Sequence, residues 1–204
     1  MYKIGIKEFD DAIGGFFDDD IVLISGPSGT GKTIISYISS ITNMRLGHKI
    51  LYILSDNSKS IFWKSIKFLN FPLEKYLDKN FMIIEFPSSE LEQLVDFSFI
   101  EQFIQDYDID MIVLDSVDSL INYYPDKLQK FFENLRNVGK FVILVSEFEN
   151  IYKYCDVVIK LNYHEIKDRK KKIFEVLKAR GRNHTTIKLI FDIYEDGIMI
   201  RTLQ

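Results

Sequence analysis

A run of eight residues near the N-terminus has the residue types and spacing needed to bind phosphates. It reads Gly26-Pro27-Ser28-Gly29-Thr30-Gly31-Lys32-Thr33 and matches the pattern G-x-x-x-x-G-K-[ST] in full. Glycines let such a loop turn tightly, so that backbone N–H groups and the start of the next helix face an anion. The lysine then reaches the β- and γ-phosphates of a nucleotide, and the hydroxyl binds Mg²⁺. We predict these roles for Lys32 and Thr33; the alternative is a glycine-rich turn that only caps a helix.

An apolar run that ends in an acid supplies a second part of the site. Met111-Ile112-Val113-Leu114-Asp115 has the form of a buried strand, and in phosphate-loop proteins an aspartate at such a strand end holds Mg²⁺. Many buried parallel strands also end in an Asp that caps the next helix. Because a phosphate loop needs a metal ligand, we predict that Asp115 binds Mg²⁺ beside Thr33.

Hydrolysis would also need a carboxylate that orients water toward the γ-phosphate. Asp56 follows the apolar run 50–55 and is the candidate, although it could equally cap a helix that begins near Asn57. Ser146 and Glu147 lie at the end of the run 140–146 and are expected to point toward the crevice where α/β sheets place their ligands. Ser146 is a candidate for contacting the γ-phosphate, and an ordinary strand-end hydroxyl is the alternative.

These residues must be positioned by alternating strands and helices. Apolar runs predict strands near 21–25, 50–55, 81–86, 111–115 and 140–146. Helical spacing is seen at 32–46, 57–69, 89–107 and 126–138, and the third of these opens with a capping box at Ser89. Short strands without intervening helices follow at 156–162, 172–179, 186–193 and 197–202. The pattern predicts an α/β fold, in which helices flank a mostly parallel central sheet with a C-terminal antiparallel β extension.

The composition is that of a globular protein. The chain has 204 residues, of which 47% are hydrophobic and 27% charged, and we find no internal repeat or linker. We therefore expect a single domain over residues 1–204. One cysteine and three scattered histidines exclude an internal disulfide and a zinc-ligand spacing. The apolar runs are too short for a transmembrane helix and the N-terminus does not resemble a signal peptide, so we expect a cytoplasmic protein.

Two segments carry a family resemblance. Residues 5–16 resemble the segment that precedes the phosphate loop in RecA/KaiC-like ATPases. Lys178-Ala179-Arg180-Gly181-Arg182-Asn183-His184, followed by Ile187 and later by Asp196-Gly197-Ile198, resembles the K-x-R-G-x-x-H…G-I pattern of KaiC domains. The resemblance covers nearly the whole chain. It implies a single KaiC-type domain with a RecA-like P-loop NTPase fold that binds ATP and Mg²⁺.

The resemblance also implies how the site is completed. In that family ATP lies between neighbouring subunits of a ring, usually a hexamer, and a Lys-x-Arg pair reaches the neighbour's γ-phosphate. Lys178 and Arg180 match these positions, and residues two apart on a strand point the same way. A solvated basic sheet edge is the alternative. The family usually has a Glu pair where this chain has Asp56-Asn57, so a nucleotide-dependent scaffold with little hydrolysis is a second hypothesis.

A basic segment raises a third hypothesis. Residues 167–182 are rich in Lys and Arg and include Lys170, Lys171 and Lys172, which could contact nucleic-acid phosphates without reading sequence. That feature would fit a recombination or repair accessory protein resembling archaeal recombinase paralogues. We favour a solvated turn instead, because the net charge is −4 and the connection 147–155, where such proteins carry a DNA-binding loop, is short and acidic.

Overall fold

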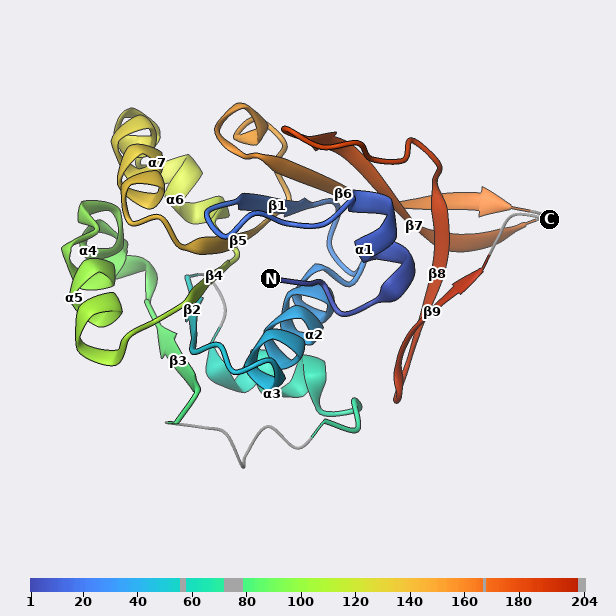
Figure 1. The fold of residues 1–204 in the computed structure, drawn as a ribbon, viewed down its shortest axis with the longest axis horizontal. Helices are drawn as coiled ribbons and strands as arrows, with labels where there is room; N and C mark the ends of the chain where they lie inside the picture. Colours follow the sequence, from blue (N-terminus) through green and yellow to red (C-terminus); the bar gives the residue numbers. More distant parts are fainter. Residues whose placement is uncertain (56–57, 72–78, 167, 202–204) are drawn as a thin grey trace.

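The computed structural model describes residues 1–55, 58–71, 79–166 and 168–201. These residues form a nine-stranded sheet in the order β3-β2-β4-β5-β1-β6-β7-β8-β9 (Figure 1). The strands are β1 Ile21–Ser25, β2 Ile50–Leu54, β3 Phe81–Glu85, β4 Met111–Asp115, β5 Phe141–Ser146, β6 Val157–Ile166, β7 Arg169–Ala179, β8 Leu189–Tyr194 and β9 Gly197–Arg201. The strands from β3 to β6 in this order run parallel, and the pairs from β6–β7 to β8–β9 are antiparallel. The predicted fold class is confirmed.

Helices cover both faces of the parallel part (Figure 1). One hydrophobic cluster joins it to α1 Lys7–Ile13, α2 Lys32–Arg45 and α3 Lys59–Ile66. The other joins it to α4 Leu91–Asp96, α5 Ser98–Tyr107, α6 Asp118–Tyr123 and α7 Leu128–Asn137. Val22 and Ile24 face the first cluster while Ile21 and Leu23 face the second, because successive strand residues point to opposite faces. Central strands buried on both faces therefore read as unbroken apolar runs.

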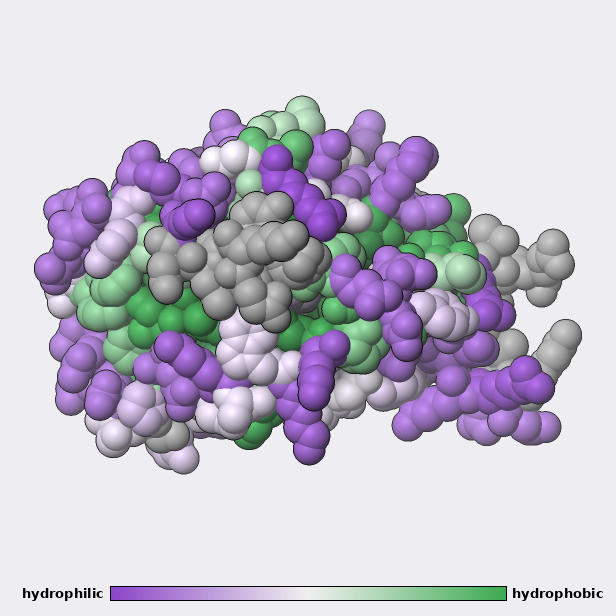
Figure 2. Space-filling model, turned by 90° about the horizontal axis from the view of Figure 1, so that it is seen from below, coloured by the Kyte–Doolittle hydropathy of each residue, from purple (hydrophilic) through white to green (hydrophobic). Residues whose placement is uncertain are grey.

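Seen from below, the molecule shows hydrophobic residues toward the middle of the face and hydrophilic residues around its periphery (Figure 2). Ile61 and Phe68 are large apolar side chains that remain exposed. Among the described residues, no helix combines the length and the apolar character needed to cross a membrane.

Several local predictions differ from the structure. Strand β6, expected in the antiparallel extension, pairs parallel with β1, with Val22 opposite Val157. The helix expected over 89–107 is interrupted at Phe97, which adopts a left-handed conformation with φ 67° and separates α4 from α5. Burial of the Phe97 ring, 5.8 Å from that of Phe131, offsets the cost of this backbone conformation. No side chain caps the preceding 3₁₀ turn, Ser88–Glu90, which follows Pro87, so the expected capping box is not formed.

The two segments that carry the family resemblance touch each other. The Arg182 guanidinium donates to both carboxylate oxygens of Asp20, at 2.6 and 2.7 Å, and to the Gly15 carbonyl at 2.6 Å. The Thr185 N–H donates to the Ala12 carbonyl. The Arg182 and Asp20 side chains are only 7% and 3% exposed. These five residues form what we call the terminal clasp, which ties the chain before β1 to the chain after β7.

Candidate functional site: the phosphate-loop pocket

The predicted phosphate loop connects β1 to α2. Gly26 and Gly31 have φ values of 142° and 104°, which L side chains rarely adopt. A Cβ on Gly31 would also lie 2.6 Å from Ile193 Cδ1. The 14-residue helix α2 begins at Lys32, and no side chain of the described residues caps its N-terminus. The backbone N–H groups of that first turn and the positive end of the helix dipole are therefore directed at the loop, as an anion requires.

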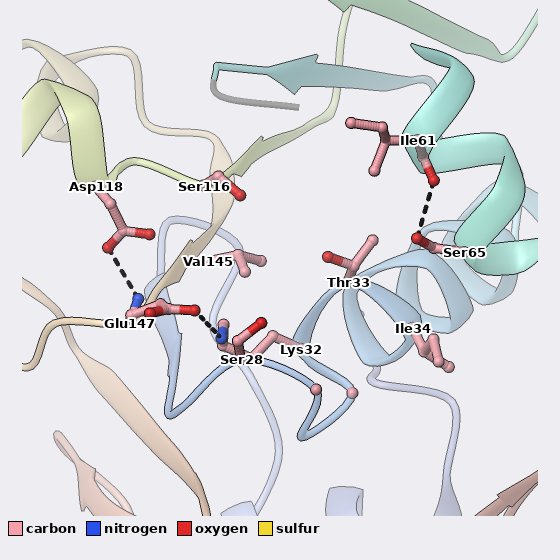
Figure 3. A pocket seen from close by; sticks show the side chains of 12 residues that line it. Ser28, Lys32, Thr33, Ile34, Ile61, Ser65, Ser116, Asp118, Val145 and Glu147 are labelled. Carbon is pink, nitrogen blue, oxygen red and sulfur yellow. Dashed lines mark hydrogen bonds and ion pairs between the residues drawn. The ribbon is translucent and has the colours of Figure 1, made fainter. Parts of the chain in front are cut away.

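A cavity of about 480 Å³ opens beside this loop. Ser28 lines it from the loop, Lys32 and Thr33 from the first turn of α2, and Asp118 and Glu147 from the segments after β4 and β5 (Figure 3). The carboxyl ends of the adjacent strands β1, β4 and β5 thus meet at one cavity, the place where α/β sheets bind ligands. The fold brings the predicted loop residues and two acidic residues together.

Asp115 and Thr33 meet at the inner end of this site. The Thr33 hydroxyl donates to Asp115 Oδ1 at 3.2 Å, and the Tyr52 phenol donates to Oδ2 at 2.8 Å. Asp115 is fully buried, and burial raises its pKa to about 6, against the lowering effect of both hydrogen bonds. In its ionised form the carboxylate can accept hydrogen bonds or bind a cation.

This pair of oxygen ligands suits Mg²⁺. Magnesium is usually held by one or two carboxylates together with water and substrate phosphates rather than by a complete protein cage. Within the described residues there is no group of three or more His, Cys, Asp or Glu that could hold a metal ion. Thr33 and Asp115 therefore fit a metal that arrives with a nucleotide and takes its remaining ligands from phosphate and water.

Lys32 is held over the loop by oxygen atoms. Its ammonium donates to the Gly26 carbonyl at 2.6 Å and the Pro27 carbonyl at 3.1 Å, and lies 3.7 Å from Glu147 Oε1. Desolvation lowers the pKa of Lys32, while the negative charges of Glu147, Asp118 and Asp115 raise it. Phosphate oxygens are hydrogen-bond acceptors, as the carbonyl and carboxylate oxygens around Lys32 are. The ammonium is therefore placed to bind a phosphate.

Ser146 is engaged within the protein. Its hydroxyl donates to Asp118 Oδ1 at 2.6 Å and accepts from the Phe148 N–H, and the Glu147 N–H donates to the same Asp118 oxygen. Ser146 is fully buried, and Glu147 lines the cavity in its place. The sequence reasoning did not single out Asp118 or Tyr52. Asp118 lies three residues after Asp115, at the same carboxyl-end edge of the sheet, which is the signal that could have indicated it.

Asp56 lies outside the described residues, and the structure describes the chain on either side of residues 56–57. The preceding Ser55 hydroxyl donates to the carbonyls of Asp115 and Ser116, which joins the end of β2 to the end of β4. The N-cap of α3 is Ser58, whose hydroxyl accepts from the Ile61 N–H. The helix expected from residue 57 therefore begins at Lys59, after a serine cap.

Lys178 and Arg180 do not line the cavity of their own chain. Lys178 donates to the Cys155 carbonyl at 2.6 Å, and Arg180 donates to Asp156 Oδ1 at 3.0 Å. Asp156 also binds Arg136 and accepts from the Ile21 N–H, which lies at the opposite end of β1 from the phosphate loop. Both cations thus face the same connection between β5 and β6.

The basic segment forms part of a long hairpin. The ammonium groups of Lys170 and Lys172 lie 4.3 and 5.8 Å from the centre of the Tyr163 ring, and Lys171 pairs with Asp192. The Tyr163 hydroxyl would be 3.0 Å from a Cβ on Gly29. This part of the basic segment is therefore packed beside the phosphate loop, on strands β6 and β7.

Comparison with known proteins agrees with this geometry. The family model described as "ATPase: KaiC" matches residues 2–204. The chain belongs to the KaiC ATPase family. Among relatives of this KaiC-family chain, a UPF0273 protein of Pyrococcus horikoshii is 26% identical, over 97% of this chain and 92% of its own length. The DNA repair and recombination protein RadB of Methanobrevibacter smithii is 29% identical, over 82% of this chain and 69% of its own length.

A solved structure shows the same fold. The crystal structure of a KaiC-like protein from Pyrococcus horikoshii superposes with a TM-score of 0.86 and covers 98% of each chain, at 22% sequence identity. The RecA/KaiC-like resemblance inferred from the two sequence segments is therefore confirmed at the level of family and fold. The roles of individual site residues stay predictions.

Proposed function

We propose that this KaiC-family chain is a Mg²⁺-dependent ATPase. The observation that carries the proposal is the pairing of the Thr33 hydroxyl with the buried Asp115 carboxylate at the start of an uncapped helix. Binding a nucleoside triphosphate needs a helix start that faces its phosphates. It also needs a pair of oxygen ligands suited to the accompanying Mg²⁺. Family membership supports ATP as the nucleotide.

Each residue has a defined task in this proposal. The loop Gly26–Thr33 and the first turn of α2 bind the phosphates, and Lys32 brings its positive charge to the β- and γ-phosphates. Thr33 and Asp115 hold the metal, which when bound neutralises charge on the phosphate oxygens. Asp56, which follows Ser55 at the end of β2, orients the attacking water. The Ser146–Asp118 hydrogen bond sets the position of the turn that carries Glu147 into the cavity.

A neighbouring subunit completes the site. Lys178 and Arg180 lie outside their own cavity, and the Arg180 side chain is 56% exposed, so its guanidinium can be presented to another molecule. A cation supplied in this way would offset the charge that develops on the transferred phosphoryl group. We therefore propose a homo-oligomer, with a hexameric ring as the expected form.

Phosphate release from ATP tests the proposal. The wild-type protein is expected to release phosphate with Mg²⁺ and to stop when the metal is chelated. Lys32→Ala should lose turnover, whereas Lys7→Ala, which removes an exposed lysine that pairs with Asp11 outside the cavity, should keep it. Wild-type turnover in the Lys32→Ala protein would exclude the proposed site.

Two other functions make distinct predictions. The short acid at Asp56 favours a nucleotide-dependent scaffold, for which ATP would bind tightly and change the size of the oligomer without being hydrolysed. Size-exclusion chromatography with and without Mg·ATP, run beside the phosphate assay, separates this case from the first.

The similarity to RadB and the basic hairpin favour DNA binding, which would be salt-sensitive and lost when Lys170, Lys171 and Lys172 are changed to Glu.

A further inference from the structure

Tyr52 is a buried polar side chain that the proposed mechanism leaves unused. It lies on strand β2, between β3 and β4, is completely buried, and packs its ring 4.9 Å from the Phe62 ring and 5.8 Å from the Phe81 ring. Phenylalanine would fill this space with the same ring. A buried hydroxyl costs free energy unless it is hydrogen-bonded, so the phenol oxygen calls for an explanation beyond packing.

The phenol hydrogen bond is directed at the predicted metal ligand. Leu54 lies opposite Asp115 in the β2–β4 pairing, and Tyr52, two residues earlier, is on the same face of the sheet. The phenol donates to Asp115 Oδ2 at 2.8 Å, and Thr33 donates to the other oxygen, Oδ1, at 3.2 Å. In this bond the phenol is the donor and the carboxylate oxygen is the acceptor.

A second hydroxyl supports the phenol. Ser36 Oγ is 2.8 Å from Tyr52 Oη, and Ser36 lies one turn after Thr33 on α2. The Tyr52 phenol donates to Asp115, while the Ser36 hydroxyl contacts the phenol oxygen and donates to the Thr33 carbonyl at 3.0 Å. Thr33, Asp115, Tyr52 and Ser36 thus form a closed chain of contacts across α2, β4 and β2.

We propose that Tyr52 is a positioning residue for the metal ligand: it fixes the Asp115 carboxylate so that Oδ1 stays directed at the Thr33 hydroxyl, and these two residues would hold the Mg²⁺ that accompanies ATP. A carboxylate is planar, so a hydrogen bond that holds Oδ2 also sets the direction of Oδ1. Hydrogen-bond partners of metal ligands act in this way, and their loss typically weakens metal affinity about 10- to 100-fold. The inference rests on the proposed function, because it assumes that Asp115 takes part in binding Mg·ATP.

The test measures equilibrium binding of a fluorescent ATP analogue while Mg²⁺ is titrated, and it does not depend on turnover. Tyr52→Phe keeps the ring and removes only the hydroxyl. We expect the Mg²⁺ concentration for half-maximal binding to rise about 10-fold in this variant, while the weak binding measured in excess chelator stays unchanged. A purely structural role would instead weaken binding equally with and without the metal.

Two further variants sharpen the result. Tyr2→Phe is the matched control, because it removes another buried phenol whose hydrogen bond goes to the Asp110 carbonyl, and its Mg²⁺ dependence should equal that of the wild type. Ser36→Ala leaves the Tyr52 phenol in place and removes its support, so we expect a smaller shift of about 3-fold in the same direction. This variant also provides the test if Tyr52→Phe fails to fold.

The outcomes separate the inference from the proposed function. If the wild type binds the analogue with Mg²⁺ and both Tyr52→Phe and Ser36→Ala show the wild-type Mg²⁺ dependence, Tyr52 does not position the ligand although the ATP site stands. If the wild type does not bind the analogue, or binds it equally in chelator, the proposed function fails and the inference fails with it. A 10-fold shift confined to the metal-dependent binding supports both.

Discussion

Glu147 places a negative charge where the γ-phosphate is expected. Its Oε1 lies 3.7 Å from Lys32 Nζ and its side chain is 50% exposed in the cavity. ATP carries one more phosphate than ADP into this region, so repulsion should weaken ATP binding more than ADP binding. We expect Glu147→Gln to tighten ATP about 5-fold, or about 1 kcal/mol, with a smaller change for ADP.

Competitive titration against a fluorescent nucleotide measures both affinities. Glu149→Gln is the matched control, because Glu149 is exposed to a similar degree but pairs with Lys160 outside the cavity. An equal gain for ATP and ADP, or no gain, would show that Glu147 does not face the terminal phosphate.

Cys155 provides a test of burial at a single residue. The thiol is completely buried, and burial raises its pKa from 9.0 to about 12 because the thiolate loses its hydration. Only the thiolate reacts with iodoacetamide, so raising the pKa lowers reactivity at pH 8. We expect native protein to be alkylated about 1,000-fold more slowly than an ordinary exposed thiol, and to react fully in guanidinium. Intact mass spectrometry follows the reaction, and fast labelling of the native protein would contradict the structure.

Among the elements, the terminal clasp joins the two distant segments that carry the family resemblance. Asp20 accepts two of the guanidinium hydrogen bonds of Arg182 and also one from the Phe17 N–H. Removing the carboxylate charge leaves a nearly buried guanidinium without its partner. We expect Asp20→Asn to lower the free energy of unfolding by about 3–5 kcal/mol in a urea titration.

The exposed pair Lys7–Asp11 is the control for this prediction. Its side chains are 84% and 64% exposed, so Asp11→Asn should change stability by less than about 1 kcal/mol. If the two substitutions changed the free energy of unfolding equally, the clasp would stabilise the fold no more than an exposed ion pair does.

The elements also show what sequence reasoning captures. Periodicity and apolar runs predicted β1 and β4 with their observed bounds, because strands buried on both faces form continuous apolar runs in the sequence. The break at Phe97 was not predicted, since burial of one ring against α7 outweighs a continuous local helical pattern. At the site, the loop motif predicted which residues would gather, whereas the hydrogen bond from Tyr52 to Asp115 depends on strand order and could not be read from spacing.

On the scale of the whole molecule, the proposed shared site predicts complementation between inactive variants. Lys32→Ala removes the phosphate-binding lysine, and Arg180→Ala removes the cation offered to a neighbour. In a mixed oligomer, an intact loop from the Arg180→Ala subunit can meet an intact Arg180 from the Lys32→Ala subunit. We expect phosphate release to reappear on mixing two inactive proteins, at up to about a quarter of the wild-type rate if subunits assort randomly and neighbouring sites act independently.

The stability of Arg180→Ala provides the control for this experiment. Asp156 keeps Arg136 and the Ile21 N–H as partners after the substitution, so the protein should fold with a loss of about 1 kcal/mol or less. Failure of mixed oligomers to recover any activity, with both variants folded and oligomeric, would place Arg180 outside the neighbour's site.

Strand β1 ends at the phosphate loop, and both strands that flank it come from much later in the chain. Val22 lies between Ile143 of β5 and Val157 of β6. During synthesis, β1 leaves the ribosome long before either partner exists, and such distant pairings are formed slowly. The loop that would hold the nucleotide therefore cannot take its final shape until most of the chain has been made, which makes nucleotide binding a late event in folding.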